Sequence, residues 1–229
     1  MLKVAQCWDD GVATDVRLIE LLRKYNAKAT FNLCPGAMKY HRVEPKWYPD
    51  KKIGCNGFHG GSVSMRELKE LYGDFQVASH CWRHETATWV PDEDFINGAV
   101  DARNFLEDTF QKECRGFAWP CGQSSPAMEE ALREAGFAYA RTIGKTENVL
   151  SCTNLMQFHP TCKFADRDFV QRYENSKKFG AFYFWGHSYE MTDEENLWQD
   201  YEAKLKMIAE DPEAEWVDVI DLANICKIK

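Results

Sequence analysis

Two adjacent aspartates, Asp9 and Asp10, stand where the first apolar run of the chain ends, in the stretch QCWDDGVATD (6–15). Like charges this close repel each other, and a turn needs only one aspartate. We interpret the two aspartates as having different roles: one carboxylate holds a metal ion, and the other takes a proton from water. Read alone, the pair also fits an ordinary helix N-terminus, where the helix dipole stabilises carboxylates and Gly11 relaxes the turn.

Two histidines four positions apart, His80 and His84, follow a later apolar run in the stretch SHCWRHE. On a helical turn this spacing places both imidazoles on one side, close enough to bind one cation. Either Asp9 or Asp10 would complete a set of two histidines and one carboxylate. Such a set leaves positions open for water and substrate, which is typical of catalytic metal sites. The pattern H-x-x-x-H also occurs by chance on polar turns, but its combination with D-D-G favours the metal site.

Three further polar features follow other apolar runs. His187 comes directly after AFYFWG (181–186), Arg141 lies at the end of another run, and W-P-C-G (119–122) follows a third. Each has an ordinary structural explanation when it is taken alone, such as a surface ion pair or a packed histidine. The carboxyl ends of parallel strands form one rim in a barrel, so we expect these residues to converge there.

The elements that must position these residues are short apolar runs that alternate with helical patterns. The runs are apolar throughout, as expected for parallel strands buried on both faces. The pattern predicts an α/β fold with a mostly parallel sheet, closed or nearly closed into a barrel, as a single domain over 1–229. Segment 34–63 has no convincing periodicity, and its role stays open. The expected strands are 3–7, 28–33, 75–79, 116–120, 138–143, 181–186 and 216–222, and the expected helices are 15–26, 64–73, 92–110, 125–136, 166–178 and 194–210.

Composition limits the possible partners and compartment. The net charge of −8 disfavours nucleic acid, and no basic run suggests an anionic membrane. Nine cysteines, an odd number without a C-x-x-C pair, favour reduced thiols. The N-terminus has no apolar core of a signal peptide, and no later segment nears 18 apolar residues. We therefore expect a cytoplasmic protein, whose oligomeric state the sequence leaves open.

The ordered motifs resemble the polysaccharide deacetylases, which are carbohydrate esterase family 4 or the NodB homology domain. The resemblance runs from CWDDG (7–11) to WVDVIDL (216–222) and includes H-x-x-x-H, a strand ending in Pro-x-Gly and a late strand ending in His. It implies a distorted (β/α)7 barrel that binds one divalent metal ion, with zinc expected and cobalt or nickel also suitable. The roles that it implies are catalytic base for Asp9, metal ligands for Asp10, His80 and His84, general acid for His187, and an oxyanion-binding backbone N–H at Cys121.

The sequence departs from the family pattern in three places. The motif-three arginine of the family would fall at Ala118, and Arg141 on the next strand is the expected replacement that pairs with Asp9. The acidic fourth motif has no clear match, with Asp166 as a candidate. W-G-H-S replaces the usual pattern aliphatic-x-His, with Trp185 at the aliphatic position. These departures bear on the identity of the substrate more than on metal binding.

Tryptophans beside the motifs could stack on sugar rings. We expect Trp119 and Trp82, together with Pro120, to contribute to substrate binding, although packing in the barrel explains a tryptophan equally well. The resemblance implies a metal-dependent hydrolase that removes acetyl groups from an N- or O-acetylated saccharide. Two alternatives stay open: an amide hydrolase of a non-sugar substrate, and a non-catalytic saccharide-binding module.

Overall fold

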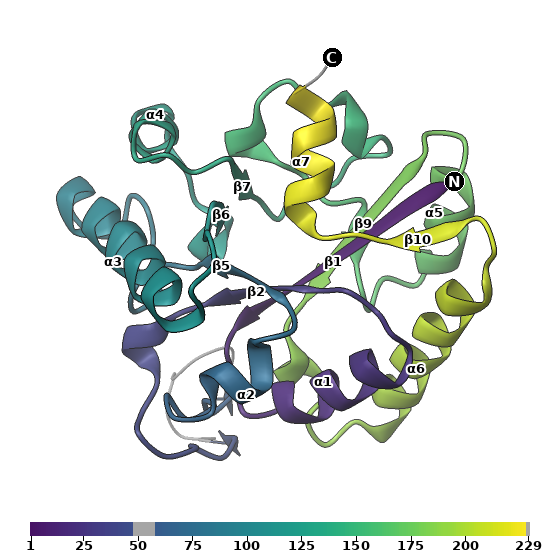
Figure 1. The fold of residues 1–229 in the computed structure, drawn as a ribbon, viewed down its shortest axis with the longest axis horizontal. Helices are drawn as coiled ribbons and strands as arrows, with labels where there is room; N and C mark the ends of the chain where they lie inside the picture. The colour runs from purple at the N-terminus through teal and green to yellow at the C-terminus, as the bar shows by residue number, and fades with distance from the viewer. Residues whose placement is uncertain (48–57, 228–229) are drawn as a thin grey trace.

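The computed structural model describes residues 1–47 and 58–227, and its centre is a curled, parallel sheet (Figure 1). The sheet order is β7-β6-β5-β2-β1-β9-β8, and β10 also pairs with β1. Every ladder in this sheet is parallel, which confirms the predicted α/β fold. The strands are β1 (Leu2–Asp10), β2 (Thr30–Leu33), β5 (Gln76–Ser79), β6 (Gly116–Ala118), β7 (Tyr139–Arg141), β8 (Cys162–Lys163), β9 (Ala181–Gly186) and β10 (Ala214–Trp216).

The helices surround the curled sheet, as the distorted (β/α)7 barrel requires (Figure 1). An isolated bridge between Arg141 and Phe158 follows the edge strand β7, so the ring of strands is not closed by a continuous ladder. No helix in the described ranges is long and apolar enough to cross a membrane. The helices are α1 (Asp15–Lys24), α2 (Leu68–Tyr72), α3 (Asp92–Phe110), α4 (Pro126–Glu134), α5 (Phe169–Ser176), α6 (Glu195–Glu210) and α7 (Val219–Lys227).

Side chains of β1 alternate between two apolar clusters, because successive residues of a strand point to opposite faces. Val4 and Trp8 pack in an outer cluster with residues of the surrounding helices. Ala5 and Cys7 pack in an inner cluster with residues of β7 and β9. Asp9 has the same parity as Ala5 and Cys7, so the alternation points its carboxylate to the inner side.

The prediction of a last strand over 216–222 is wrong. Strand β10 ends at Trp216, and α7 begins at Val219. Asp221 accepts a hydrogen bond from the backbone N–H of Asp218 at 3.0 Å, an arrangement that resembles a capping box. The buried residues then recur at helical spacing, which a short apolar run does not reveal. These buried residues are Val219, Leu222, Ala223 and Cys226.

Two other expectations change in extent. The helix expected over 64–73 covers only Leu68–Tyr72, and Ser64 and Glu67 form a turn in which Glu67 accepts from the Ser64 N–H at 3.0 Å. Strand β8 was not predicted, because two residues give no periodic signal. Segment 34–63 contains a short antiparallel pair, β3 (Lys46–Trp47) and β4 (Phe58–His59), and its part 48–57 lies outside the described residues.

Candidate active site

A cavity of about 690 Å³ lies at the carboxyl ends of the central strands. It is lined by all of the residues for which sequence analysis expected a catalytic or metal-binding role. Parallel pairing of β1 with β2 and β9 brings segments that are far apart in the sequence to one edge. The lining residues with an expected role are Asp9, Asp10, His80, His84, Arg141 and His187.

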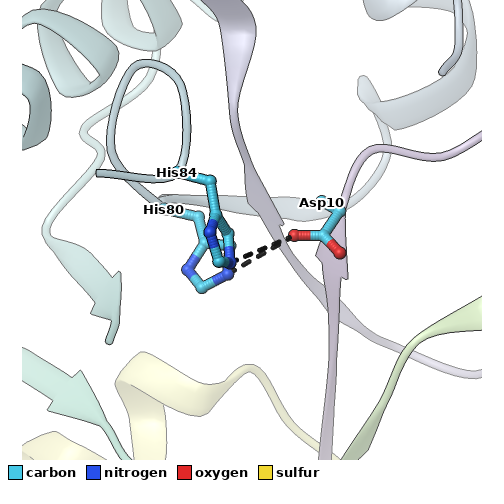
Figure 2. Close-up of side chains that lie close together, drawn as sticks. All are labelled: Asp10, His80 and His84. Atoms are coloured by element: carbon cyan, nitrogen blue, oxygen red, sulfur yellow. Dashed lines mark ion pairs between the residues drawn. The ribbon is translucent and has the colours of Figure 1, made fainter. Parts of the chain in front are cut away.

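Asp10, His80 and His84 converge on one point at this edge (Figure 2). One ligand atom from each lies within 4.8 Å of the others. Asp10 Oδ1 is 3.5 Å from His80 Nε2 and 3.9 Å from His84 Nε2. Sequence analysis from spacing alone left either aspartate as the ligand, and the structure places Asp10, not Asp9, in this cluster. Two imidazole nitrogens and one carboxylate oxygen form a donor set that suits zinc, cobalt or nickel.

Burial prepares His80 to act as a neutral ligand. Its side chain is buried, and this desolvation lowers its pKa to about 4, against the opposite influence of Asp9 and Asp10. His80 Nδ1 lies 2.8 Å from the carbonyl oxygen of Ala118, which accepts the Nδ1 proton and leaves the Nε2 lone pair facing Asp10. A neutral imidazole with its Nδ1–H anchored is the form that binds a metal ion.

The histidine spacing arises from a loop and not from the expected helical turn. No helix covers 80–84, and Cys81 and His84 have positive φ values of 62° and 64°. Asp10 and Cys121 share this left-handed conformation, with φ of 81° and 53°. Non-glycine residues in this region cost about 1–3 kcal/mol each and concentrate at functional sites.

Asp9 forms a buried ion pair with Arg141, and both side chains are almost fully inaccessible. Asn32 donates from Nδ2 to Asp9 Oδ1 at 2.7 Å, and His187 Nε2 lies 3.6 Å from Asp9 Oδ2. Burial alone would raise the pKa of Asp9, but Arg141, with help from His80, His187 and Asn32, holds it well below its usual range. The guanidinium also lies 4.6 Å from the centre of the Trp185 ring. Asn32 was missed by sequence analysis, because only the β1–β2 register places it opposite Asp9.

His187 lies between Asp9 and a second carboxylate, Glu190. The His187 Nδ1 is 2.6 Å from Glu190 Oε1, and the other Glu190 oxygen pairs with Lys163. Burial lowers the pKa of His187, but the Glu190 hydrogen bond and the charges of Asp10 and Asp9 outweigh it and raise the pKa. Sequence analysis missed Glu190, although its i+3 spacing from a candidate acid was visible.

The expectation that Asp166 tunes this histidine is wrong. Asp166 pairs with Lys145 at 2.6 Å and accepts from the Lys163 backbone N–H at 3.0 Å. The acidic partner of His187 is therefore local in sequence, on the 3-10 helix Ser188–Met191 that directly follows the histidine.

The residues expected to bind substrate divide into two groups. Cys121 is exposed and lines the cavity, as expected. Trp119 lines it too, but the side chain is only 1% exposed, stacks on Phe95 and donates to the Met156 carbonyl at 2.8 Å, so no open face remains for a sugar.

Trp82 and Pro120 are not among the described residues that line the cavity. Trp82 packs edge-on against Phe105. The wall instead presents Trp89, which is 69% exposed. Trp119 is therefore used in packing, Trp82 is partly exposed away from the described cavity wall, and a role of either ring in sugar binding stays a prediction.

Comparisons with known proteins show the family of the chain. A family model described as polysaccharide deacetylase matches residues 2–140. This range includes Asp9, Asp10 and both cluster histidines, and it ends one residue before Arg141. The comparison with curated proteins finds no match.

Among solved structures, the chain resembles the peptidoglycan deacetylase PdaC of Bacillus subtilis, with a TM-score of 0.58 and 13% identity over 99% of this chain and 92% of that chain. It also resembles a family 4 acetyl xylan esterase of Clostridium thermocellum solved with a cobalt ion, with a TM-score of 0.56 and 15% identity over 97% and 91%. For the Streptococcus pyogenes deacetylase PplD, solved with acetate, the TM-score is 0.53 at 15% identity, over 67% of this chain and 61% of that chain. At these identities the likeness shows the fold.

Proposed function

Because the chain belongs to the polysaccharide deacetylase family, we propose that it is a metal-dependent hydrolase that removes acetyl groups from an N- or O-acetylated saccharide. The observation that carries this proposal is the content of one cavity. It holds three possible metal ligands (Asp10, His80 and His84), the buried carboxylate of Asp9, and His187, whose Nδ1 is paired with Glu190. A saccharide-binding module would need neither the proton acceptor Asp9 nor the proton donor His187. Their presence together favours catalysis.

Asp10, His80 and His84 would hold the ion, because their three ligand atoms lie close together and the anchored Nδ1 of His80 leaves its Nε2 free to bind. A divalent ion held there supplies Lewis acidity that polarises an acyl carbonyl. Zinc is the expected metal, and cobalt or nickel would suit the same donors.

In the proposed reaction, Asp9 takes a proton from the attacking water as the new bond to the acyl carbon forms. Arg141 and Asn32 orient the Asp9 carboxylate and keep it in the proton-accepting form. His187 donates a proton to the leaving nitrogen or oxygen as the acyl bond breaks, and Glu190 keeps the imidazole protonated. The exposed strand-end residue Cys121 would offer its backbone N–H to the oxyanion.

The cavity walls suit a neutral ligand. Apart from Asp9, Asp10 and Arg141, the described lining residues include no Asp, Glu, Lys or Arg. The volume of about 690 Å³ lies within the range of pockets that bind small molecules. Apolar and aromatic side chains make up the outer walls, and they favour the flat, apolar faces of sugar rings. These outer-wall residues include Phe58, Trp89, Ile143 and Tyr189.

The direct test is an acetate-release screen with zinc-loaded protein over N- and O-acetylated sugars, xylo-oligosaccharides and peptidoglycan fragments. Release above the background of an Asp9→Asn control supports the proposal. Saccharide binding without acetate release would favour the non-catalytic saccharide-binding module. Acetate release from simple non-sugar amides alone would favour the amide hydrolase of a non-sugar substrate.

Replacement of Trp89 by alanine is expected to raise KM for an acetylated oligosaccharide by about 10-fold, with little change in kcat. The ring is exposed in the cavity wall and carries no group that transfers a proton, so its loss is expected to remove binding and not chemistry. Michaelis kinetics of acetate release measure this. The control is Tyr40→Ala, because Tyr40 is 72% exposed and does not line the cavity. An unchanged KM in Trp89→Ala would contradict the assignment.

The Glu190→Gln variant is expected to move the basic limb of the kcat/KM profile to lower pH. Glu190 raises the pKa of His187, so a neutral amide lets this pKa fall, and the histidine loses its proton at a lower pH. At pH 8 the rate should drop by about 10-fold or more, which is part of the usual contribution of a general acid. A pH series for parent and variant tests this, with Glu194→Gln as the control on the exposed surface. A basic limb that stays in place would exclude Glu190 from this role.

We also propose a cytoplasmic location. Among the described cysteines, Cys7, Cys34, Cys81, Cys114 and Cys162 are buried free thiols. Burial raises the pKa of several of these thiols, so they are unreactive side chains of the core. A chain rich in free thiols suits a reducing compartment.

A further inference from the structure

Asp15 is a fully buried carboxylate that the proposed chemistry does not use. It is the first residue of α1, and it accepts hydrogen bonds from Ser188 Oγ and, at 2.8 Å, from the Tyr72 hydroxyl. Burial raises its pKa to about 7, although both hydrogen bonds act to lower it. Burying a carboxylate costs stability, so its position calls for a compensating role.

Asp15 connects the two chain segments that carry Asp9 and His187. Helix α1 follows the Asp9–Asp10 end of β1 after a short turn. Ser188 comes directly after His187 and begins the 3-10 helix that carries Glu190. The Asp15–Ser188 hydrogen bond therefore joins positions that are 173 residues apart in the sequence.

The sheet itself does not hold His187 in place. The β1–β9 ladder ends at the pair Trp8–Gly186, one residue before the histidine. Beyond that pair, side-chain contacts must set the distance of 3.6 Å between His187 Nε2 and Asp9 Oδ2. Ser188, the residue after His187, reaches back to the β1–α1 segment through its hydrogen bond to Asp15 and through a second contact, at 2.7 Å, with Thr14 Oγ1.

We propose that Asp15 is a positioning residue that, through its buried hydrogen bond with Ser188, sets the distance between Asp9 and His187. This inference rests on the proposed deacetylase function, in which those two groups move protons on one substrate. Proton transfer is sensitive to small displacements, so a shift of His187 lowers kcat while metal binding at Asp10, His80 and His84 is kept.

Two variants separate positioning from stability. Ser188→Ala and Tyr72→Phe each remove one hydrogen-bond donor from the same Asp15 carboxylate, so both are expected to lower the melting temperature. Only Ser188 belongs to the segment of His187, because Tyr72 lies on α2. With zinc-loaded protein, Ser188→Ala is expected to lower kcat by at least about 10-fold with unchanged KM, whereas Tyr72→Phe keeps kcat.

A third variant, Thr14→Val, removes the Thr14–Ser188 contact and leaves the Asp15 bond, so it is also expected to keep kcat. If Ser188→Ala does not fold, Ser188→Cys takes its place, because a cysteine side chain is similar in size to serine and is a weaker hydrogen-bond donor. Equal losses of kcat in Ser188→Ala and Tyr72→Phe would overturn the inference, because Asp15 would then act only through stability.

The NMR signal of the His187 ring provides a readout that is independent of activity. With ring-labelled histidine at one pH, the His187 resonances are expected to shift in Ser188→Ala and to stay in place in Tyr72→Phe. If the parent protein releases no acetate from any substrate, the proposed function fails, and this spectrum still decides the inference. Identical His187 signals in the parent and in Ser188→Ala would overturn it.

Discussion

Asp9→Asn is expected to keep one divalent ion bound per chain and to lower turnover by a factor of about 10²–10⁴. The amide cannot take a proton from water, while the ligand cluster Asp10, His80 and His84 is untouched. The change also leaves the buried Arg141 guanidinium without its partner, so stability falls as well. Turnover must therefore be measured below the melting temperature of the variant.

The matched control for this experiment is the neighbouring change Asp10→Asn, at the other aspartate of the pair. Asp10 lies in the ligand cluster, so this variant is expected to lose the ion together with turnover. Zinc calorimetry and acetate release on the same preparations separate the two roles. Turnover of Asp9→Asn within about 10-fold of the parent would remove Asp9 from the mechanism.

Arg141→Ala is expected to cost about 3–5 kcal/mol of unfolding free energy, because it leaves the Asp9 carboxylate buried and unpaired. Arg141 is the main influence that lowers the pKa of Asp9, so its removal raises that pKa. The acidic limb of the kcat/KM profile then moves to higher pH. Denaturant unfolding and a pH series measure both effects.

The pH dependence of stability has a definite sign. The pKa of Asp9 lies below its unfolded value of 3.8, so the carboxylate contributes stability that is present above this value and is lost as the pH falls below it. Arg141→Ala removes that contribution. The control is the double variant Asp9→Asn, Arg141→Met, which has no unpaired buried charge and is expected to be more stable than Arg141→Ala. If the double variant were as unstable as the sum of the single changes Asp9→Asn and Arg141→Met, the ion-pair account would be contradicted.

Much of the site was predictable because parallel strands bring their carboxyl ends together. Asp9, His80 and His187 each end or follow a buried apolar run, and the fold places such ends around one cavity. Arg141 could be proposed as the partner of Asp9 because it lies on the strand next to Ala118, the position of the family's motif-three arginine. Because side chains alternate between the two faces of a strand, Asp9 and Arg141 then both point to the inner side of the sheet.

What sequence could not provide depends on tertiary packing. Trp119 and Trp82 are next to motifs, but their rings fill the space against Phe95 and Phe105. Burial of a tryptophan is decided by its neighbours in space, which one sequence does not reveal. The same holds for Asn32, which reaches Asp9 only through the β1–β2 register.

Local structure was the other source of error. The apolar stretch 216–222 fits a strand and a helix equally well, and the helical stripe of α7 continues into residues beyond it. The spacing of His80 and His84 was interpreted as a helical turn, whereas two left-handed residues achieve the same approach. The set of polar residues that meets at the cavity could be predicted from the sequence, whereas the backbone that presents His80 and His84 could not.

The central claim is that Asp10, His80 and His84 bind one divalent ion, and calorimetric titration of metal-stripped protein with zinc tests it most directly. His84→Ala is the informative variant, because His84 is partly exposed while His80 is buried against Ala118. His59→Ala is the control, because His59 lines the same cavity outside the cluster. We predict one ion per chain in the parent and in His59→Ala, with binding lost or strongly weakened in His84→Ala. No binding by the parent, or equal binding by His84→Ala, would contradict the account.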